Sequence, residues 1–269
     1  MPALRVQGEV AGAILEMRSL RTGWGCEVSQ NTSAAVMQQR SEARDSLDDF
    51  PTPCWATRAL CNFIAGRLTT QRLGTLTCRE PCANRGHMLR VLQEYFGDID
   101  AFDVHDYGLG LPVVDYLFPI PMDPVDWTFM NPPFRLAQEF IEQALATSRC
   151  GVVVVCRSGF LEGEERFREL FSRRPPAYVL QFSERVVMLK GRLVRSGDPD
   201  PSDDKPNRKA GTASSCSALI WSHETDVKKQ FDWIGPCRRE LEVEGDYPAE
   251  PDGLAVLHRT KEKNGGQAA

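Results

Sequence analysis

Four consecutive residues, Asn131-Pro132-Pro133-Phe134, combine side-chain and backbone groups that could activate an amine. The two prolines lack N–H donors and fix φ near about −65°, which leaves the neighbouring carbonyls free and rigidly oriented. The Asn131 amide oxygen and the Pro132 carbonyl then form a double acceptor. An aromatic exocyclic amine that donates both N–H groups to this pair becomes pyramidal, and its lone pair becomes available. Phe134 would stack on the planar substrate, a contact worth roughly 1–3 kcal/mol.

Taken alone, the tetrapeptide could equally be a stiff turn in which Asn131 closes an Asx-turn. Its surroundings favour a site, because it follows an apolar segment with the pattern of a strand and precedes one with helical spacing. Strands and helices alternate along the chain, which predicts a mostly parallel, doubly wound α/β sheet with ligands at the carboxyl ends of its strands. Strands are predicted at 74–77, 99–104, 126–130, 152–156, 178–182, 186–189 and 219–221, and helices at 55–68, 86–96, 136–146 and 160–171.

A second candidate site lies upstream, where the predicted strand 74–77 leads into Glu80-Pro81-Cys82-Ala83-Asn84-Arg85-Gly86. A turn of this kind lets the backbone approach a ligand closely at the start of a helix. Asp103 ends the next predicted strand, 23 residues after Glu80. That spacing is typical of an acidic residue that binds ribose hydroxyls in nucleotide-binding sheets.

With these motifs in this order, residues 50–221 resemble the class I S-adenosylmethionine-dependent amino-methyltransferases, particularly DNA adenine-N6 methyltransferases of phage and prophage type. The resemblance implies a Rossmann-like fold with a seven-stranded, mostly parallel sheet and one antiparallel strand. It also implies S-adenosylmethionine as cofactor and direct in-line methyl transfer to the N6 amine of adenine in DNA. The implied catalytic residues are Asn131, Pro132, Pro133 and Phe134, and the implied cofactor-binding residues are Thr52, Pro53, Glu80, Pro81, Cys82, Asn84, Gly86, Asp103, Asp115 and Tyr116.

The chain departs from the family pattern at Asn84, which stands where the family's turn has its first glycine. After glycine, asparagine best tolerates a left-handed backbone, so we expect the geometry of the turn to be preserved.

Cys82 follows Pro81, as the nucleophile does in cytosine-C5 methyltransferases. That nucleophile belongs after the fourth strand, where this chain has Asn131 instead, so Cys82 is predicted to line the cofactor turn.

Charge along the chain bears on the choice of substrate. The net charge of −5 argues against indiscriminate nucleic-acid binding, but residues 149–211 hold thirteen Lys or Arg against nine Asp or Glu. Arg185, Lys190 and Arg192 are predicted to hold DNA backbone phosphates, with a surface hairpin as the alternative. A target base in duplex DNA would have to be flipped into the site.

The composition divides the chain into parts. Residues 1–48 are predicted to be an N-terminal extension, partly disordered, and residues 49–235 the catalytic domain. Within it, 191–215 is rich in Gly, Pro, Ser, Asp and Lys and is predicted to be a flexible loop that could meet the substrate. Residues 236–269 are predicted to be a polar tail.

The nine cysteines are scattered and form no C-x-x-C pair, and the four histidines have no ligand spacing, so we expect reduced thiols and no metal. Neither a membrane span nor a signal peptide is visible. The sequence therefore predicts a cytoplasmic protein with no membrane partner, and the resemblance to phage and prophage enzymes implies a bacterial or phage-infected cell.

Two alternatives to the DNA adenine prediction remain open. The Asn-Pro-Pro-Phe motif also serves enzymes that methylate guanine N2 in RNA or a glutamine amide in protein. A catalytically silent, methyltransferase-like binding subunit is the alternative from another class, and Asn84 in the cofactor turn motivates it.

Overall fold

The computed structural model describes residues 47–200, 209–212, 214–223 and 229–248. These belong to the second of two units into which the chain divides, Ser33–Ala269. The predicted extension up to residue 46, the predicted tail from residue 249, and residues 201–208 and 213 of the predicted loop lie outside the described residues.

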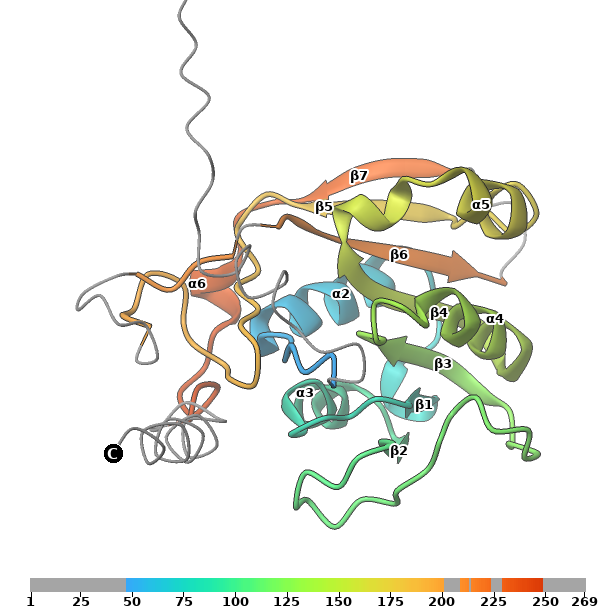
Figure 1. Cartoon of the computed structure of the whole chain (residues 1–269), viewed down its shortest axis with the longest axis horizontal. Helices are drawn as coiled ribbons and strands as arrows, with labels where there is room; N and C mark the ends of the chain where they lie inside the picture. The colour runs from blue at the N-terminus through green and yellow to red at the C-terminus, as the bar shows by residue number, and fades with distance from the viewer. Residues whose placement is uncertain (1–46, 201–208, 213, 224–228, 249–269) are drawn as a thin grey trace, which may run out of the picture. The chain divides into compact units, whose positions relative to one another are not determined.

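A seven-stranded sheet organises the described unit (Figure 1). The strands follow the order β2-β1-β3-β4-β6-β5-β7, and only β6 runs antiparallel to its neighbours. The prediction of a mostly parallel seven-stranded sheet with one antiparallel strand is therefore confirmed. The strands are β1 Thr77–Glu80, β2 Asp98–Ala101, β3 Val125–Met130, β4 Ser148–Arg157, β5 Tyr178–Phe182, β6 Cys216–Ser222 and β7 Gln230–Ile234.

Helices cover both faces of this sheet (Figure 1). The helices α2 (Cys54–Arg67) and α3 (His87–Tyr95) pack on one face, and α4 (Ala137–Thr147) packs on the other. The β-branched run of β4 serves both cores, because alternate valines contribute to opposite faces. The shorter helical segments are η2 Leu73–Thr75, η3 Ser158–Leu161, α5 Glu164–Arg166, η4 Phe167–Phe171 and α6 Arg238–Leu241.

A glycine fixes the contact between the two central strands. Gly151 of β4 pairs with Trp127 of β3, and a Cβ atom at Gly151 would lie only 2.6 Å from the Trp127 ring. Because glycine has no Cβ, the buried indole packs directly against β4. This packing positions the end of β3, where the Asn131 loop begins.

Several predicted elements differ from the structure. β1 begins only at Thr77, and the predicted helix 160–171 is divided into η3, α5 and η4. No strand forms at 186–189, where the backbone makes a single bridge from Leu189 to Arg192. β7 is not predicted by the sequence patterns, because it buries only Ile234 and lacks the continuous apolar run of a buried strand.

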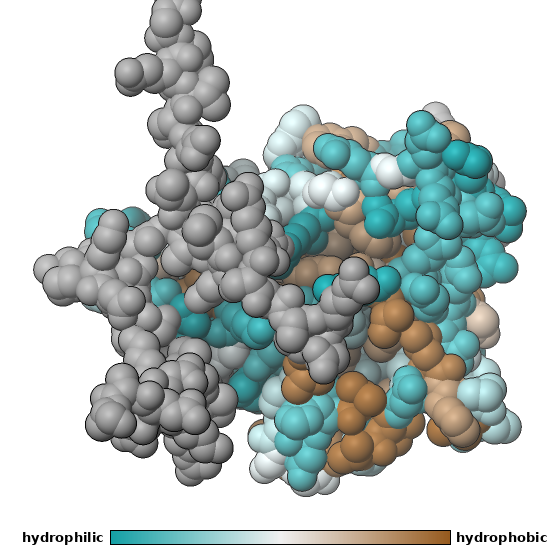
Figure 2. All heavy atoms as spheres, viewed as in Figure 1, coloured by the Kyte–Doolittle hydropathy of each residue, from teal (hydrophilic) through white to brown (hydrophobic). Residues whose placement is uncertain are grey.

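A long loop connects β2 to β3. Residues 102–124 form no strand, and their only sheet-like pairing is one bridge, from Asp103 to Val113. Figure 2 shows hydrophobic surface low in the view, where Figure 1 places this loop. The exposed apolar side chains of the loop are Val104, Leu109, Val113, Phe118 and Ile120.

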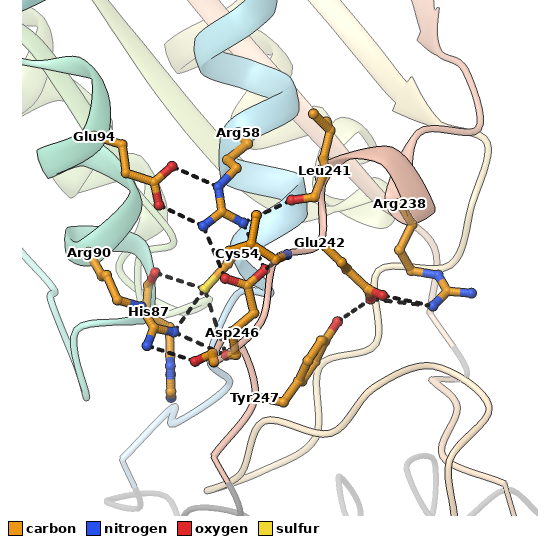
Figure 3. A network of polar contacts seen from close by, with 12 residues as sticks. Cys54, Arg58, His87, Arg90, Glu94, Arg238, Leu241, Glu242, Asp246 and Tyr247 are labelled. Carbon is orange, nitrogen blue, oxygen red and sulfur yellow. Dashed lines mark hydrogen bonds and ion pairs between the residues drawn. The ribbon is translucent and has the colours of Figure 1, made fainter.

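The chain after α6 is fastened to α2 and α3 by four charged residues, which we name the Arg58 cluster: Arg58, Arg90, Glu94 and Asp246 (Figure 3). Arg58 bonds Glu94 of α3 at 2.6 and 2.7 Å and Asp246 at 2.7 and 3.0 Å. Arg90 donates to the Asp246 carbonyl at 3.0 Å. Asp246 is only 2% exposed, so the described part of the predicted polar tail packs against the domain.

Within the described ranges, no helix is both long enough and apolar enough to cross a membrane. No group of three or more His, Cys, Asp or Glu side chains in the same ranges could hold a metal ion.

Candidate functional site

A cavity opens at the carboxyl ends of β1, β2 and β3, with an empty volume of about 700 Å³ that includes the space at its mouth. β2 and β3 lie on opposite sides of β1, so the cavity occupies the point where the strand order reverses. Open α/β sheets bind ligands at such a point. The lining comes from residues 47–52 before α2, 80–88 after β1, 103–116 after β2 and 131–140 after β3.

The turn after β1 has the backbone geometry expected from its sequence. Asn84 has a φ of 51° and is the one non-glycine residue with positive φ among the described residues, while Gly86 has a φ of 74°. The expected left-handed conformation of Asn84 is confirmed. Its backbone N–H donates to Asp103 Oδ2 at 2.9 Å, and its Nδ2 donates to Asp49 Oδ1 at 2.8 Å.

Glu80 places a buried carboxyl group at the cavity wall. It is 2% exposed, and its Oε2 accepts no hydrogen bond from any described residue. Burial raises the pKa of Glu80 well above its ordinary value, and the nearby negative charge of Asp103 adds to the increase. A buried carboxyl with an unused acceptor beside a cavity is suited to bind a donor group of a ligand.

Asp103 stands next to Glu80 and organises the backbone around it. Its two oxygens accept from the N–H groups of Asn84 at 2.9 Å and His105 at 3.0 Å. Burial raises the pKa of Asp103, and these hydrogen bonds oppose that increase. Each oxygen keeps a second lone pair, so Asp103 could also accept from a ligand hydroxyl at the cavity.

Asn131 follows β3 and has a fixed amide. Its Nδ2 donates to the Phe50 carbonyl at 2.7 Å and to Thr52 Oγ1 at 3.1 Å. Because a carbonyl can only accept, this contact identifies the amide nitrogen and turns Oδ1 away from Phe50. No described residue donates a hydrogen bond to Oδ1 or to the Pro132 carbonyl. The proposed double acceptor is therefore not occupied by the described part of the chain.

Cys82 connects the two halves of the site. Its Sγ donates to the Asn131 carbonyl at 3.4 Å. Burial raises the pKa of the Cys82 thiol well above its ordinary value, and the charges of Glu80 and Asp103 raise it further. A thiol held protonated is a poor nucleophile, which agrees with a lining role for this residue.

Phe134 belongs to an aromatic group that the sequence patterns do not reveal. Its backbone N–H donates to Asp48 Oδ2 at 2.7 Å, and its ring lies 5.6 Å from that of Phe50 at an angle of 39°. The guanidinium carbon of Arg157 lies 4.0 Å from the centre of the Phe134 ring and 5.1 Å from that of Phe50.

The structure brings most of the predicted site residues to one cavity. Pro53 and Gly86 instead precede helices α2 and α3, and exposed Asp115 accepts the N–H of Leu117 at 3.0 Å within a turn. Pro132 and Phe134 lie beside the cavity without lining it. The predicted residues that line it are Thr52, Glu80, Pro81, Cys82, Asn84, Asp103, Tyr116, Asn131 and Pro133.

The structure corrects one of the predicted phosphate contacts. Arg192 is 3% exposed, and its Nε and Nη2 bond Asp200 at 3.1 and 2.9 Å, so its charge is already compensated inside the fold. Arg185 is exposed and donates to the Thr212 carbonyl at 2.9 Å. Lys190 is half-buried.

The described part of the predicted flexible loop packs on the domain. Leu193, Val194 and Ala210 are buried, and Val194 and Ala210 form a small apolar cluster with Val187 and Leu189. The Gly191 N–H also donates to the Asp49 carbonyl at 2.8 Å. These residues therefore brace the segment before α2.

Comparison with known proteins gives weak likenesses only. No family model and no curated protein matches the chain. Many solved structures show distant similarity, of which three are examples. The methyltransferase subunit of a type I restriction-modification system from Streptococcus thermophilus is 13% identical with a TM-score of 0.49; the match covers 80% of this chain and 53% of that chain, so this chain spans only about half its length. A proposed RNA methyltransferase from Pyrococcus horikoshii is 16% identical with a TM-score of 0.45, over 70% of this chain and 96% of that chain. An S-adenosylmethionine-dependent O-methyltransferase from Thermotoga maritima is 14% identical with a TM-score of 0.37, over 62% of this chain and 66% of that chain.

With these identities and TM-scores below 0.5, none of the three decides the substrate or reaction of this chain.

Proposed function

We propose that this chain is an S-adenosylmethionine-dependent methyltransferase that acts on the exocyclic N6 amine of adenine in DNA. The observation that carries the proposal is the anchored amide of Asn131. Phe50 and Thr52 hold its nitrogen at 2.7 and 3.1 Å, while Oδ1 and the Pro132 carbonyl receive no donor from the described residues. An amide fixed in this way is preorganised for a substrate that brings two N–H groups.

The opposite side of the cavity fits the cofactor. Glu80 offers an unused buried acceptor, and the left-handed turn at Asn84 brings backbone close to the same space. Asp103 retains lone pairs for hydroxyl groups of a ribose. S-adenosylmethionine, when bound, would supply a methyl group made electrophilic by its sulfonium centre.

The residues of the chain would prepare the amine. Oδ1 of Asn131 and the Pro132 carbonyl would accept its two N–H bonds, which localises the nitrogen lone pair. Both acceptors are rigid, because the Asn131 amide is anchored and Pro132 and Pro133 restrict the backbone. The methylated nitrogen would then release its extra proton to solvent, because the two amide-type oxygens are too weakly basic to accept it, and no dedicated general base is proposed.

DNA is proposed as the acceptor for two reasons. The ordered motifs that begin at Thr52-Pro53 resemble those of DNA adenine methyltransferases, and residues 149–211 are locally basic. Guanine N2 in RNA and a glutamine amide also present two N–H groups, so both remain outcomes of the test. The preserved turn at Asn84 weakens the case for a silent subunit, since the residue that motivated it adopts the required conformation.

The test is a methyl-transfer assay with labelled S-adenosylmethionine and three parallel acceptors: DNA, ribosomal RNA and ribosome-associated protein. We expect label in DNA and N6-methyladenine by nucleoside mass spectrometry. Label in RNA or protein alone would change the substrate. Absence of label from all acceptors, together with no cofactor binding by calorimetry, would overturn the methyltransferase proposal.

Substitution of Asn131 tests the mechanism. Asn131→Ala should lower kcat roughly 100- to 1,000-fold, the usual cost of one preorganised polar contact to a reacting group. Cofactor affinity should change little, because Asn131 contributes its acceptor to the substrate. Asn62→Ala is the matched control, since Asn62 is exposed on α2 and bonds only Tyr95 among the described residues.

A further inference from the structure

Arg157 ends β4 at the same edge of the sheet as the Asn131 loop. β3 and β4 are parallel, with Met130 paired to Val154, so both strands deliver their carboxyl ends there. The Arg157 backbone is fixed on its other side by antiparallel pairing with Cys216 of β6. Its side chain then lies over Phe134, at 4.0 Å from the ring centre.

The guanidinium occupies a place that a planar substrate would need. A flat cation 4.0 Å from a ring centre is stacked on that ring, as a heteroaromatic base would be. The Phe134 backbone is held in place, because its N–H donates to Asp48 Oδ2 at 2.7 Å, and its ring centre lies 5.6 Å from that of Phe50. A base that uses this face of Phe134 must therefore displace the guanidinium.

Displacement of the Arg157 guanidinium by a base replaces one contact with the Phe134 ring by another. The displaced guanidinium keeps its positive charge and stays near the rim of the sheet. A guanidinium and a base make contacts of similar strength with an aromatic ring, so the contact that Phe134 loses with Arg157 is replaced by its contact with the base. The displaced side chain stays charged, because arginine does not lose its proton in proteins. Its Cα remains at the rim of the sheet, where a nucleotide stacked on Phe134 would bring its own phosphate.

We propose that Arg157 takes the place of the acceptor base on Phe134 in the free protein and, once displaced by that base, binds a backbone phosphate of the nucleic acid. The inference rests on the proposed function, because it requires a nucleotide acceptor. It makes Arg157 a specificity-determining residue. A phosphate-bearing nucleotide compensates the released guanidinium, whereas a free base or a protein amide does not.

The test measures binding of fluorescein-labelled single-stranded and duplex DNA by anisotropy over a series of KCl concentrations. Loss of one phosphate contact in Arg157→Ala should reduce the slope of log K against log salt by about 0.7 for single strands and about 0.9 for duplex. Arg157→Lys keeps the charge and should keep the slope. KM for DNA should rise in Arg157→Ala while cofactor affinity stays unchanged.

Arg149→Ala is the matched control. Arg149 lies near the opposite end of β4, is exposed and pairs with Asp126 at 3.1 Å, so its loss should leave the slope unchanged. Near-UV circular dichroism and cofactor calorimetry check that each variant is folded, and Arg157→Gln replaces Arg157→Ala if the alanine variant is not.

The outcomes separate this inference from the proposed function. If the wild-type protein methylates DNA but Arg157→Ala has an unchanged salt slope and KM, the Arg157 inference fails and the proposed function stands. If the wild-type protein methylates only protein, or nothing, both fail. A reduced slope in Arg157→Ala, restored by lysine, supports the phosphate contact.

Discussion

Two buried ionisable groups beside α3 contrast sharply in their hydrogen bonding. Arg58 is 5% exposed, and its donors make five hydrogen bonds, to Glu94, Asp246 and the Leu241 carbonyl (Figure 3). Glu80 is equally buried, but its Oε2 has no partner among the described residues. A saturated buried charge stabilises the fold, whereas we propose that the unused acceptor of Glu80, which lies beside a cavity, binds a ligand.

The acidic members of the two regions also differ in pKa. Burial alone would raise the pKa of Asp246, but hydrogen bonds from Arg58 and the Val243 N–H, together with the charges of Arg58 and Arg90, outweigh it and hold the pKa below its ordinary value. The pKa of Glu80 is raised instead, because no cation compensates its burial. Helix α3 connects the regions, since Glu94 lies near its end and His87 at its start lines the cavity.

The largest expected effect is on stability, from removal of the central arginine. Arg58→Met would leave Asp246 buried without its charge partner, so the free energy of unfolding should fall by about 3–5 kcal/mol in urea denaturation. Arg67→Met is the control, because Arg67 lies on the same helix, is 59% exposed and pairs with Asp232 only at 3.7 Å. Its effect should stay within about 0.5 kcal/mol. Equal effects of the two variants would contradict the structural role of the Arg58 cluster.

Glu80→Gln should have the opposite effect to Arg58→Met: it should lower cofactor affinity without lowering stability. Leaving a buried ligand donor without its partner costs about 1–3 kcal/mol, so we expect affinity for S-adenosylmethionine to fall roughly 5- to 100-fold in calorimetry. Stability without cofactor should not fall. A raised folded-state pKa means that ionised Glu80 destabilises the fold progressively as the pH rises above its ordinary value of 4.5, and glutamine removes this penalty.

Glu94→Gln completes the comparison, because it should lower stability and leave cofactor affinity unchanged. Glu94 bonds Arg58 at 2.6 and 2.7 Å and does not line the cavity. If Glu80→Gln lowers stability at pH 7 while Glu94→Gln lowers cofactor affinity, the proposed division between the two regions is wrong.

Low pH should remove the stabilising contribution of the Arg58 cluster, because Asp246 becomes protonated. Its folded-state pKa lies below the ordinary value of 3.8, so its stabilising contribution is present above pH 3.8 and is lost as the pH falls through the lower folded-state value. Asp246→Asn should therefore be less stable than the wild type at pH 7, and the difference should shrink below pH 3.8. Urea denaturation at several pH values measures this, and a constant difference would argue against the ionised pair.

What the sequence predicts well in this protein is local. The alternation of strands and helices predicts the parallel sheet, and the residue type at Asn84 predicts its left-handed backbone. The Asn131 loop falls at the end of a strand as expected. Each of these features depends on neighbouring residues, whose spacing and backbone preferences are visible in the chain itself.

What the sequence does not predict depends on residues far apart in the chain. Asn131 meets Phe50 across 81 positions, and Arg58 meets Asp246 across 188. The proposed phosphate contact of Arg192 fails for the same reason, since nothing in the sequence pattern pairs it with Asp200 and buries both. Composition alone likewise cannot show that the described part of 191–215 is packed.

Asn84 is expected to show the smallest effect on stability. It lies at the cavity, as Glu80 does, but its polar groups are hydrogen-bonded to Asp49, Arg85 and Asp103, as those of Arg58 are to its partners. Asn84→Ala keeps a Cβ at a φ of 51°, which costs roughly 1–2 kcal/mol, whereas Asn84→Gly relieves that strain. Both variants remove the Asp49 contact, so the difference between them isolates the backbone. We expect alanine to be less stable than glycine by about 1 kcal/mol and to bind cofactor more weakly. Equal stability of the two in urea denaturation would mean that the turn relaxes, and that its left-handed form is not what shapes the cavity.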